Sequence, residues 1–338
     1  MCKNTVLNLK KSFSIVEIAI SLSIIGLLSV ASLSGVAIMQ QSRANVIIQQ
    51  YQTYHKAIND FYKTYNYLPG DLPDAQYRFA PKGYTKSTPA QITALDINTR
   101  DRIPINGDGK GYIYQCWKAF GSSSTTDGLS FWSMLGASGL INEKYSSFCK
   151  KNGTSVPKIS ECIEAGYNMP SVKYGFKDAV WNFISIYRTS EDHEAFLGSL
   201  KSSSDLYSSS ALEIVVFDDE LTHNAGEMEC PNYASFLPTP RGGISNKLLK
   251  IIDTKIDDGK PLTGNVLGHN SAKKDICYTG TQNCAIEEKK CVNTPAGRAI
   301  NYKLSASELS ENNFKEINKY TDQKSARCIG LFLMSEYR

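Results

Sequence analysis

FSIVEIAISLSIIGLLSVASLSGVAIM, residues 13–39, is the stretch of this 338-residue chain that decides its architecture. From Ile18 to Met39 it runs for 22 residues without a charged side chain. About 20 such residues are enough for a helix to cross a bilayer. Because Lys10 and Lys11 precede the run, we expect the N-terminus to stay in the cytoplasm and the rest of the chain to be exported.

Glu17 is unusual because it places a carboxylate inside the apolar run. A carboxylate at the centre of a membrane helix costs about 2.5–3.5 kcal/mol on insertion scales, and less near one end. A charge that is kept despite this cost predicts a partner or a functional role.

Two interpretations of the run compete. In the first it is an ordinary secretory signal, with the preceding lysines as its basic region and a cut near Ser29-Val30-Ala31. Glu17 argues against this interpretation, because the core of such a signal is normally uncharged. In the second the cut falls between Ser12 and Phe13, the helix is retained, and Glu17 becomes the fifth residue of the mature chain.

The segment Lys10-Lys11-Ser12-Phe13-Ser14-Ile15-Val16-Glu17 resembles the prepilin processing motif of type IV pilins and type II secretion pseudopilins, and Ile24-Ile25-Gly26-Leu27-Leu28 matches that family in place. The resemblance implies cleavage by an inner-membrane prepilin peptidase after Ser12 and N-methylation of Phe13. It also implies that Glu17 meets the N-terminal amine of a neighbouring subunit. Such an amine is mostly protonated near neutrality and would pair with a carboxylate inside a helix bundle.

This sequence departs from the family pattern at two points. Ser12 stands before the expected cut, where the family usually has Gly. The family often has a Pro within the apolar segment, whereas here only Gly35 lies nearby, and Gly weakens a helix modestly. The small size of Ser12 is compatible with processing.

The helix is expected to continue beyond Met39, because apolar and aromatic side chains recur at steps of four and three. These residues are Ile47, Tyr51, Tyr54, Ile58, Phe61 and Tyr65. Pro69-Gly70 should end it. We therefore expect a leader peptide at 1–12, a transmembrane and filament-core helix at 13–39, an amphipathic continuation at 40–66 and a periplasmic globular head at 67–338.

The head is predicted to be of the α+β class, with an antiparallel sheet against the long helix, as in pilins. Three sequence segments resemble parts of large prepilin-type proteins. They are residues 67–75, the expected helix at 131–141 and the expected helix and turn at 251–261. Residues 180–187, 212–217 and 328–334 read as strands, and 121–126 and 201–210 as flexible loops.

Cysteine usage indicates an oxidising compartment. Besides Cys2 in the leader, the chain has an even set of eight, which predicts four disulfides. Zinc is the weaker alternative because no CxxC pair occurs. Spacing leaves about 105 connectivities open. The candidates are Cys116, Cys149, Cys162, Cys230, Cys277, Cys284, Cys291 and Cys328.

Two acidic segments resemble parts of calcium loops. Asn106 and Asp108 fit the first two ligand positions of such a loop, but Trp117 stands where the acidic twelfth residue is required. Asp257 and Asp258 form a second candidate, since some pseudopilins hold calcium in a late loop. Both segments also read as plain Gly-Asp turns. We expect no cofactor, with calcium as the less favoured reading.

No catalytic pattern is present. The four histidines form no HExxH, and the chain lacks GxSxG, P-loop and dinucleotide-binding glycine patterns. Without Lys3, Lys10 and Lys11, 34 basic residues face 33 acidic ones, so nothing indicates a nucleic-acid partner. No small-molecule substrate is evident either.

The expected function is structural rather than enzymatic. The chain reads as a single-pass inner-membrane subunit of a type IV pilus or a type II secretion pseudopilus, with other pilin-like subunits as partners. Its large head favours a minor or tip subunit, because each head along a shaft must fit beside its neighbours. The alternative is an exported, disulfide-bonded periplasmic enzyme or binding protein with an ordinary signal peptide.

Overall fold

The computed structural model shows a protein of mixed α/β class, with a long apolar N-terminal helix and an antiparallel sheet. The chain divides into two units, Met1–Arg43 and Ala44–Arg338. The structure describes residues 14–80, 97–100, 103–109, 111, 113, 127–148, 162–187, 208–217, 241–270, 290–293, 315, 318–323 and 326–334.

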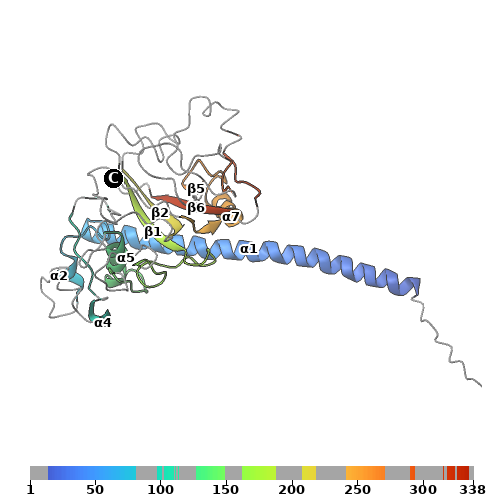
Figure 1. Cartoon of the computed structure of the whole chain (residues 1–338), viewed down its shortest axis with the longest axis horizontal. Helices are drawn as coiled ribbons and strands as arrows, with labels where there is room; N and C mark the ends of the chain where they lie inside the picture. The colour runs from blue at the N-terminus through green and yellow to red at the C-terminus, as the bar shows by residue number, and fades with distance from the viewer. Residues whose placement is uncertain are drawn as a thin grey trace, which may run out of the picture. The chain divides into compact units, whose positions relative to one another are not determined.

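Helix α1 spans Ile15–Tyr65 and is the blue helix of Figure 1. It passes through Gly35 without a break. Within the second unit its apolar stripe is buried, as Ile47 and Phe61 show with no exposed surface. The helix ends where expected, because Asn66 takes the left-handed conformation (φ 58°) that commonly follows a helix.

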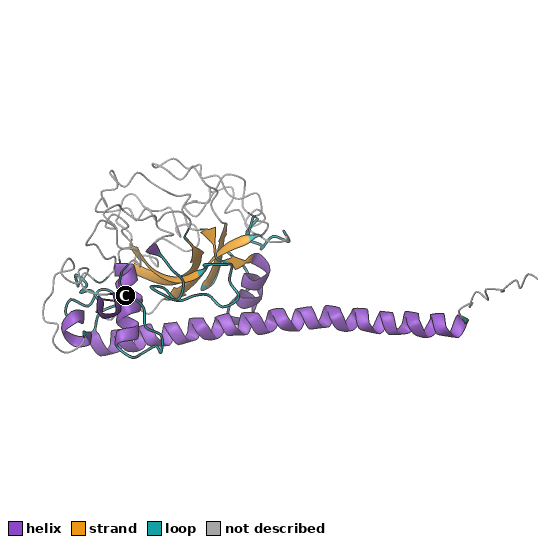
Figure 2. Cartoon of the chain, turned by 60° about the horizontal axis from the view of Figure 1, so that its bottom comes forward, coloured by secondary structure: helices purple, strands orange, loops and turns teal. Residues whose placement is uncertain are grey.

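The sheet is antiparallel throughout, with β1, β2, β6 and β4 in that order, β3 beside β2 and β5 beside β6. Its strands, orange in Figure 2, are β1 Val180–Tyr187, β2 Ser208–Val216, β3 Arg241–Gly242, β4 Ile244–Ser245, β5 Val266–Asn270 and β6 Arg327–Met334.

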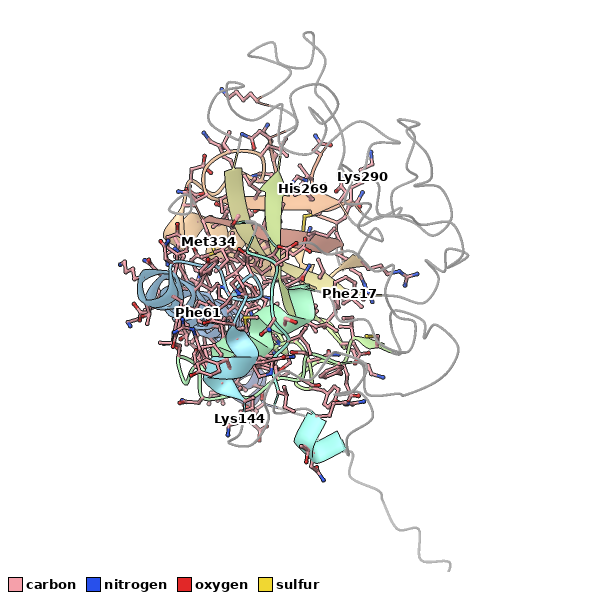
Figure 3. All side chains as sticks on the ribbon, turned by 90° about the vertical axis from the view of Figure 1, so that its left-hand side faces the viewer. Phe61, Lys144, Phe217, His269, Lys290 and Met334 are labelled. Carbon is pink, nitrogen blue, oxygen red and sulfur yellow. A yellow bond between two sulfur atoms is a disulfide. The ribbon has the colours of Figure 1, made fainter. Side chains whose placement is uncertain are left out.

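One face of the sheet packs on the second-unit part of α1, because side chains alternate between the two faces of a strand. The Trp181 ring of β1 lies 6.0 Å from that of Tyr54, and the Phe332 ring of β6 lies 4.8 Å from that of Tyr51. Figure 3 shows side chains crowded between helix and sheet around Phe61 and Met334. The expected sheet against the long helix is therefore present.

Helix α5, Asp127–Ala137, closes the side of this core. Its Trp132 ring lies 5.1 Å from that of Tyr54, and its Phe131 stacks on Phe183 of β1 at 4.2 Å. The remaining helices are α2 Ala75–Phe79, α4 Ile97–Arg100 and α7 Asn246–Ile256.

Helix α7 follows β4 directly and lies beside β6 (Figure 1). Its N-terminus is capped by Ser245, whose hydroxyl accepts a hydrogen bond from the Leu248 amide. Leu248, Leu249 and Ile252 are buried, whereas its lysines face outward. The expected late helix and turn are thus present, although the helix begins before residue 251.

Two sequence-based boundaries were wrong. The helix expected at 131–141 lies at 127–137, because Gly139 adopts a left-handed φ of 77° just after the last helical turn. The loop expected at 201–210 gives way to strand at Ser208, since β2 pairs with β1 down to that residue. The Ser-rich composition of this segment had indicated a loop rather than a strand. Residues 201–207 and 121–126, the rest of the expected loops, lie outside the described part of the chain.

Candidate functional site

The apolar half of α1 is the most unusual surface of the described molecule. Ile15 is 86% exposed, Leu27 72% and Ile38 68%. Among the described helices, α1 is the one long and apolar enough to cross a membrane, by length and composition alone. A secretory signal near the N-terminus would pass the same criterion, so this finding by itself leaves both interpretations of the run open.

Glu17 takes part in a reciprocal cap at the start of α1. Its carboxylate accepts a hydrogen bond from the Ser14 amide at 2.9 Å, and the Ser14 hydroxyl accepts one from the Val16 amide at 3.3 Å. Ser14 and Glu17 stand three apart, as in a capping box, which satisfies helix-terminal amides that otherwise lack partners. The Ser-x-x-Glu pattern is visible in the sequence, although the cap was not predicted from it.

The expected cut between Ser12 and Phe13 lies outside the described residues, as does the methylated terminus. The cap nevertheless bears on it. A cut at this place would remove neither Ser14 nor Glu17, so the mature chain would keep both capping residues.

The first acidic segment forms a junction with the turn that follows α1. The amides of Gly107 and Gly109 donate to the carbonyls of Leu72 and Asp71 at 2.9 and 3.1 Å. The buried Asp71 carboxylate also accepts from the Gly111 amide at 2.8 Å. A Cβ on Gly107 would lie 2.2 Å from the Asp71 carbonyl carbon, so only glycine fits this approach.

Asn106, a candidate calcium ligand, uses its side-chain oxygen within this junction. It accepts a hydrogen bond from the Gln76 amide in the first turn of α2 at 2.8 Å. Asp108 is exposed at the surface of the same loop. The contacts of Asn106 therefore describe a structural turn joining two Gly-Asp segments.

The second acidic segment gathers three carboxylates at the end of α7. Asp257 and Asp258 lie close to Asp253, which was not among the predicted ligands, and one oxygen of each carboxylate falls within 4.8 Å of the others. Asp253 precedes Asp257 by four residues, one helical turn, and this spacing could have revealed it.

Each of these carboxylates already accepts hydrogen bonds. Those of Asp253 come from the Tyr320 hydroxyl and the Gly259 amide, at 2.8 and 2.9 Å. Asp257 accepts from the Val266 amide at 2.7 Å. Asp258 accepts from the Lys260 amide and the Thr263 hydroxyl, at 2.9 and 2.6 Å.

Burial raises the pKa of Asp253 to about 7. The hydrogen bonds from Tyr320 and Gly259 oppose this rise in part, because they stabilise the ionised carboxylate. Calcium takes six to eight oxygen ligands and favours ionised carboxylates. Hydrogen-bond donors surround this cluster, and one of its acids, Asp253, is readily protonated. The geometry of the cluster therefore suits a closed turn between α7 and β5 better than a cation site.

A buried polar pair lies on the sheet face opposite α1. The Asn182 amide donates to the carboxylate of Glu213, directly across from it on β2, and both are buried. Burial raises the pKa of Glu213 to about 7. The pair was not predicted from the sequence, although Asn182 and Glu213 each interrupt an apolar strand pattern.

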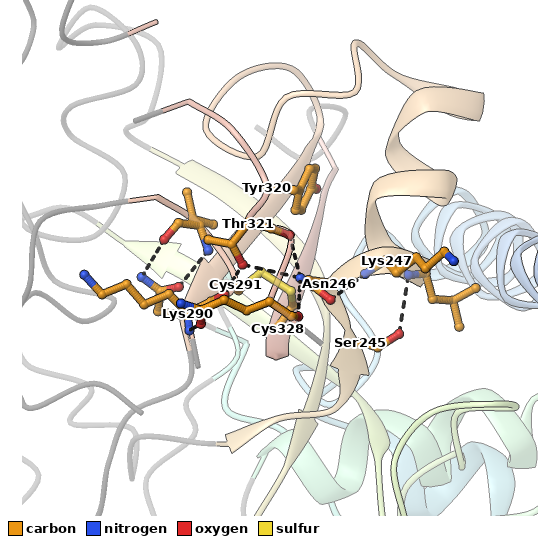
Figure 4. The surroundings of a disulfide bond; sticks show 12 residues. Ser245, Asn246, Lys247, Lys290, Cys291, Tyr320, Thr321 and Cys328 are labelled. Carbon is orange, nitrogen blue, oxygen red and sulfur yellow. Dashed lines mark hydrogen bonds between the residues drawn. A yellow bond between two sulfur atoms is a disulfide. The ribbon is translucent and has the colours of Figure 1, made fainter. Parts of the chain in front are cut away.

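Two of the eight candidate cysteines, Cys291 and Cys328, form a disulfide with a Cα–Cα distance of 5.2 Å (Figure 4). The bridge ties the 290–293 segment to the start of β6, beside Asn246, which donates to the Thr321 carbonyl at 2.7 Å. Cys162 is also disulfide-bonded. The other candidates, Cys116, Cys149, Cys230, Cys277 and Cys284, lie outside the described residues.

Comparison with known proteins found no match for this chain among family models, curated proteins or solved structures.

Proposed function

We propose that the chain is a structural, pilin-like subunit, minor or at the tip, of a type IV pilus or a type II secretion pseudopilus. The observation that carries the proposal is the division within α1. Its first half is apolar and exposed, and its second half lies in the core of the second unit. Prepilin peptidase would cut between Ser12 and Phe13 and leave this helix on the mature protein.

The exposed apolar half needs a non-aqueous environment. Contiguous apolar surface on this scale marks a membrane or protein interface. A helix apolar on every side can be buried by lipid tails before assembly, and by copies of the same helix in a filament afterwards. The proposal assigns these two environments to one segment, in the inner membrane first and in the filament core later.

Under this proposal the Glu17 carboxylate has one hydrogen-bond partner in the single chain and another in the filament. In the single chain it accepts the Ser14 amide. Within a filament a neighbouring N-terminal amine, mostly protonated near neutrality, would offer it a charged partner instead. The Ser14 amide is neutral, whereas an ammonium would add the attraction between opposite charges to the hydrogen bond, which favours the exchange. The carboxylate is then kept because it adds an intersubunit pair.

Intact mass and N-terminal sequencing of the membrane-bound protein test the proposal. Cleavage after Ser12 leaves 326 of the 338 residues, because 12 are removed. The new terminus would be Phe13, heavier by one methyl group. A mature terminus at Ser32 or later would contradict the proposal and support an exported protein with an ordinary signal peptide.

A further inference from the structure

A short segment, residues 318–321, lies between the disulfide and the turn that joins α7 to β5. Its backbone forms an antiparallel bridge with the segment 290–293, and the Thr321 amide donates to the Cys291 carbonyl at 3.0 Å. Cys291 is bonded in turn to Cys328 of β6, and Figure 4 shows Thr321 beside this bridge. Main-chain contacts therefore tie the position of 318–321 to the disulfide.

The side chains of the same segment reach the turn. The Tyr320 hydroxyl donates to the Asp253 carboxylate at 2.8 Å. The Asn318 side chain accepts from the Leu262 amide at 2.9 Å and donates to the Thr263 hydroxyl at 3.2 Å. Tyr320 and Asn318 are both buried, so these bonds are costly to leave unmade. The segment thus holds the turn through its side chains and the disulfide through its backbone.

The two sulfur atoms can be reached only after a local opening. Cys291 and Cys328 are both fully buried, whereas a thiol reductant must attack one of their sulfurs directly. Asn270 of β5 holds one covering segment, because its side-chain oxygen accepts from the Val292 amide at 2.8 Å. Since the segments 290–293 and 318–321 are also bound to each other, an opening that exposes the sulfurs strains the contacts that hold the turn.

The bond from Tyr320 to Asp253 makes such an opening costly. Without it, the buried Asp253 carboxylate keeps the Gly259 amide as a donor, at 2.9 Å, and loses the hydroxyl. A buried acid that loses a donor costs more than the bond alone is worth. By linkage, the stability that the closed turn adds to the bridge equals the stability that the bridge adds to the closed turn.

We propose that Asp253, Tyr320 and the Cys291–Cys328 disulfide form a redox-sensitive latch, in which the intact bridge keeps the turn closed and the closed turn shields the bridge from thiols. A dithiol opens the latch by exchange. One of its thiolates attacks a sulfur of the bridge to give a mixed disulfide, and its second thiol displaces the other sulfur. Two electrons pass to the bridge, two cysteine thiols are released, and the reductant becomes a disulfide. Tyr320 is then free to leave Asp253.

The rate of reduction of this one bridge tests the latch. The full-length chain in detergent is treated with dithiothreitol, quenched with an alkylating agent at intervals, and analysed by mass spectrometry of the peptides that contain Cys291 and Cys328. Tyr320→Phe keeps the ring and removes the hydroxyl, and should speed reduction roughly tenfold. Asn318→Ala loosens the same turn without changing Tyr320, and should act in the same direction.

Tyr54→Phe is the matched control, because it removes another buried tyrosine hydroxyl, one that bonds to Tyr145 and Gln50 in the core beside α1. Its reduction rate should equal that of the unaltered chain. A rate unchanged in both Tyr320→Phe and Asn318→Ala would overturn the latch. Equal acceleration in Tyr54→Phe would also overturn it, because reduction would then follow global unfolding.

The reverse direction is measured by hydrogen exchange in the Cys291→Ser/Cys328→Ser variant. The amides of residues 257–265 should exchange faster than in the unaltered chain, while those of β1 should keep their rates. Unchanged exchange in the turn, or an equal increase in β1, would contradict the coupling. None of these measurements involves cleavage or assembly, so the latch and the pilin-like function can fail independently.

Discussion

The two halves of α1 have similar helical structure and opposite surroundings. Between Ile15 and Met39 the large apolar side chains that the structure describes are about half or more exposed, whereas Ile47, Ile58 and Phe61 are fully buried. The first half is apolar on all sides, and the second has one apolar stripe and one polar face. The comparison teaches that a one-sided stripe is satisfied within the chain, while an all-round apolar surface must find its partner outside it.

The strongest way to break this comparison is to truncate one side chain in each half. Phe61→Ala should lower the free energy of unfolding of the second unit by about 3–5 kcal/mol, because it leaves a cavity in a packed core. Leu27→Ala should stay within about 0.5 kcal/mol in detergent, as an exposed position does. Thermal and denaturant unfolding of the solubilised chain measure both. Similar losses would show that Leu27 is packed within the chain after all.

Variants of Glu17 can separate membrane insertion from filament assembly, the two functions proposed for the exposed half of α1. Glu17→Leu removes both the cap and the charge, and Glu17→Gln keeps a cap acceptor without the charge. If a neighbouring amine is the partner, both variants should insert and be cleaved but fail to enter filaments, since an unpaired buried charge costs about 3–5 kcal/mol.

Recovery of each variant with sheared filaments, relative to its amount in the membrane, measures this effect. Ser14→Ala is the control, because it removes the hydroxyl of the cap and leaves the carboxylate. Normal incorporation of Glu17→Gln together with loss in Glu17→Leu would assign the residue to capping alone.

Reduction should act on the second unit and spare the apolar half. The Cys291–Cys328 bridge spans 37 residues of sequence, and a loop of that length contributes about 2–4 kcal/mol. A Cys291→Ser/Cys328→Ser double variant should show this loss in denaturant unfolding while membrane insertion stays unchanged. An unaltered midpoint would mean that the bridge adds nothing to the unit. Labelling of free thiols in the denatured, unreduced protein should find none among the eight candidates.

The last expected effect is a pH trend in the second unit. The pKa values of Asp253 and Glu213 are raised to about 7 in the folded state, from about 4 in an unfolded chain. The folded state then binds more protons between these values, so stability should rise as pH falls from 7 toward 5, on the order of 1 kcal/mol per pH unit for each group at most.

Asp253→Asn and Glu213→Gln should each flatten this trend, measured by urea midpoints across the pH range.

Calcium gives a further check. If millimolar calcium bound the cluster of Asp253, Asp257 and Asp258, it would hold Asp253 ionised, raise the midpoint at pH 7 and remove its share of the pH trend. We expect no such change, in keeping with a closed turn.

The periodic parts of the fold were predictable because local patterns carry them. The steps of four and three from Ile47 to Tyr65 predicted a helix that ends within a residue of the observed place. The apolar run Val180–Tyr187 matched β1 from end to end. In both cases side-chain periodicity and a turn signal are local properties, and neither depends on which distant segment packs against the element.

By itself, the sequence determined the exposed apolar helix, its carboxylate at Glu17, and the strand character of β1, β6 and most of β2, but not β3, β4 or β5. Only the tertiary structure brought Asp253 to Tyr320, Asn106 to the start of α2, and Cys291 to Cys328. These contacts join positions from 30 to 67 residues apart, and they form because the packing of helices and strands brings each donor to its acceptor and the two thiols together. The spacing of residues along the sequence does not reveal which distant positions the folded core brings together.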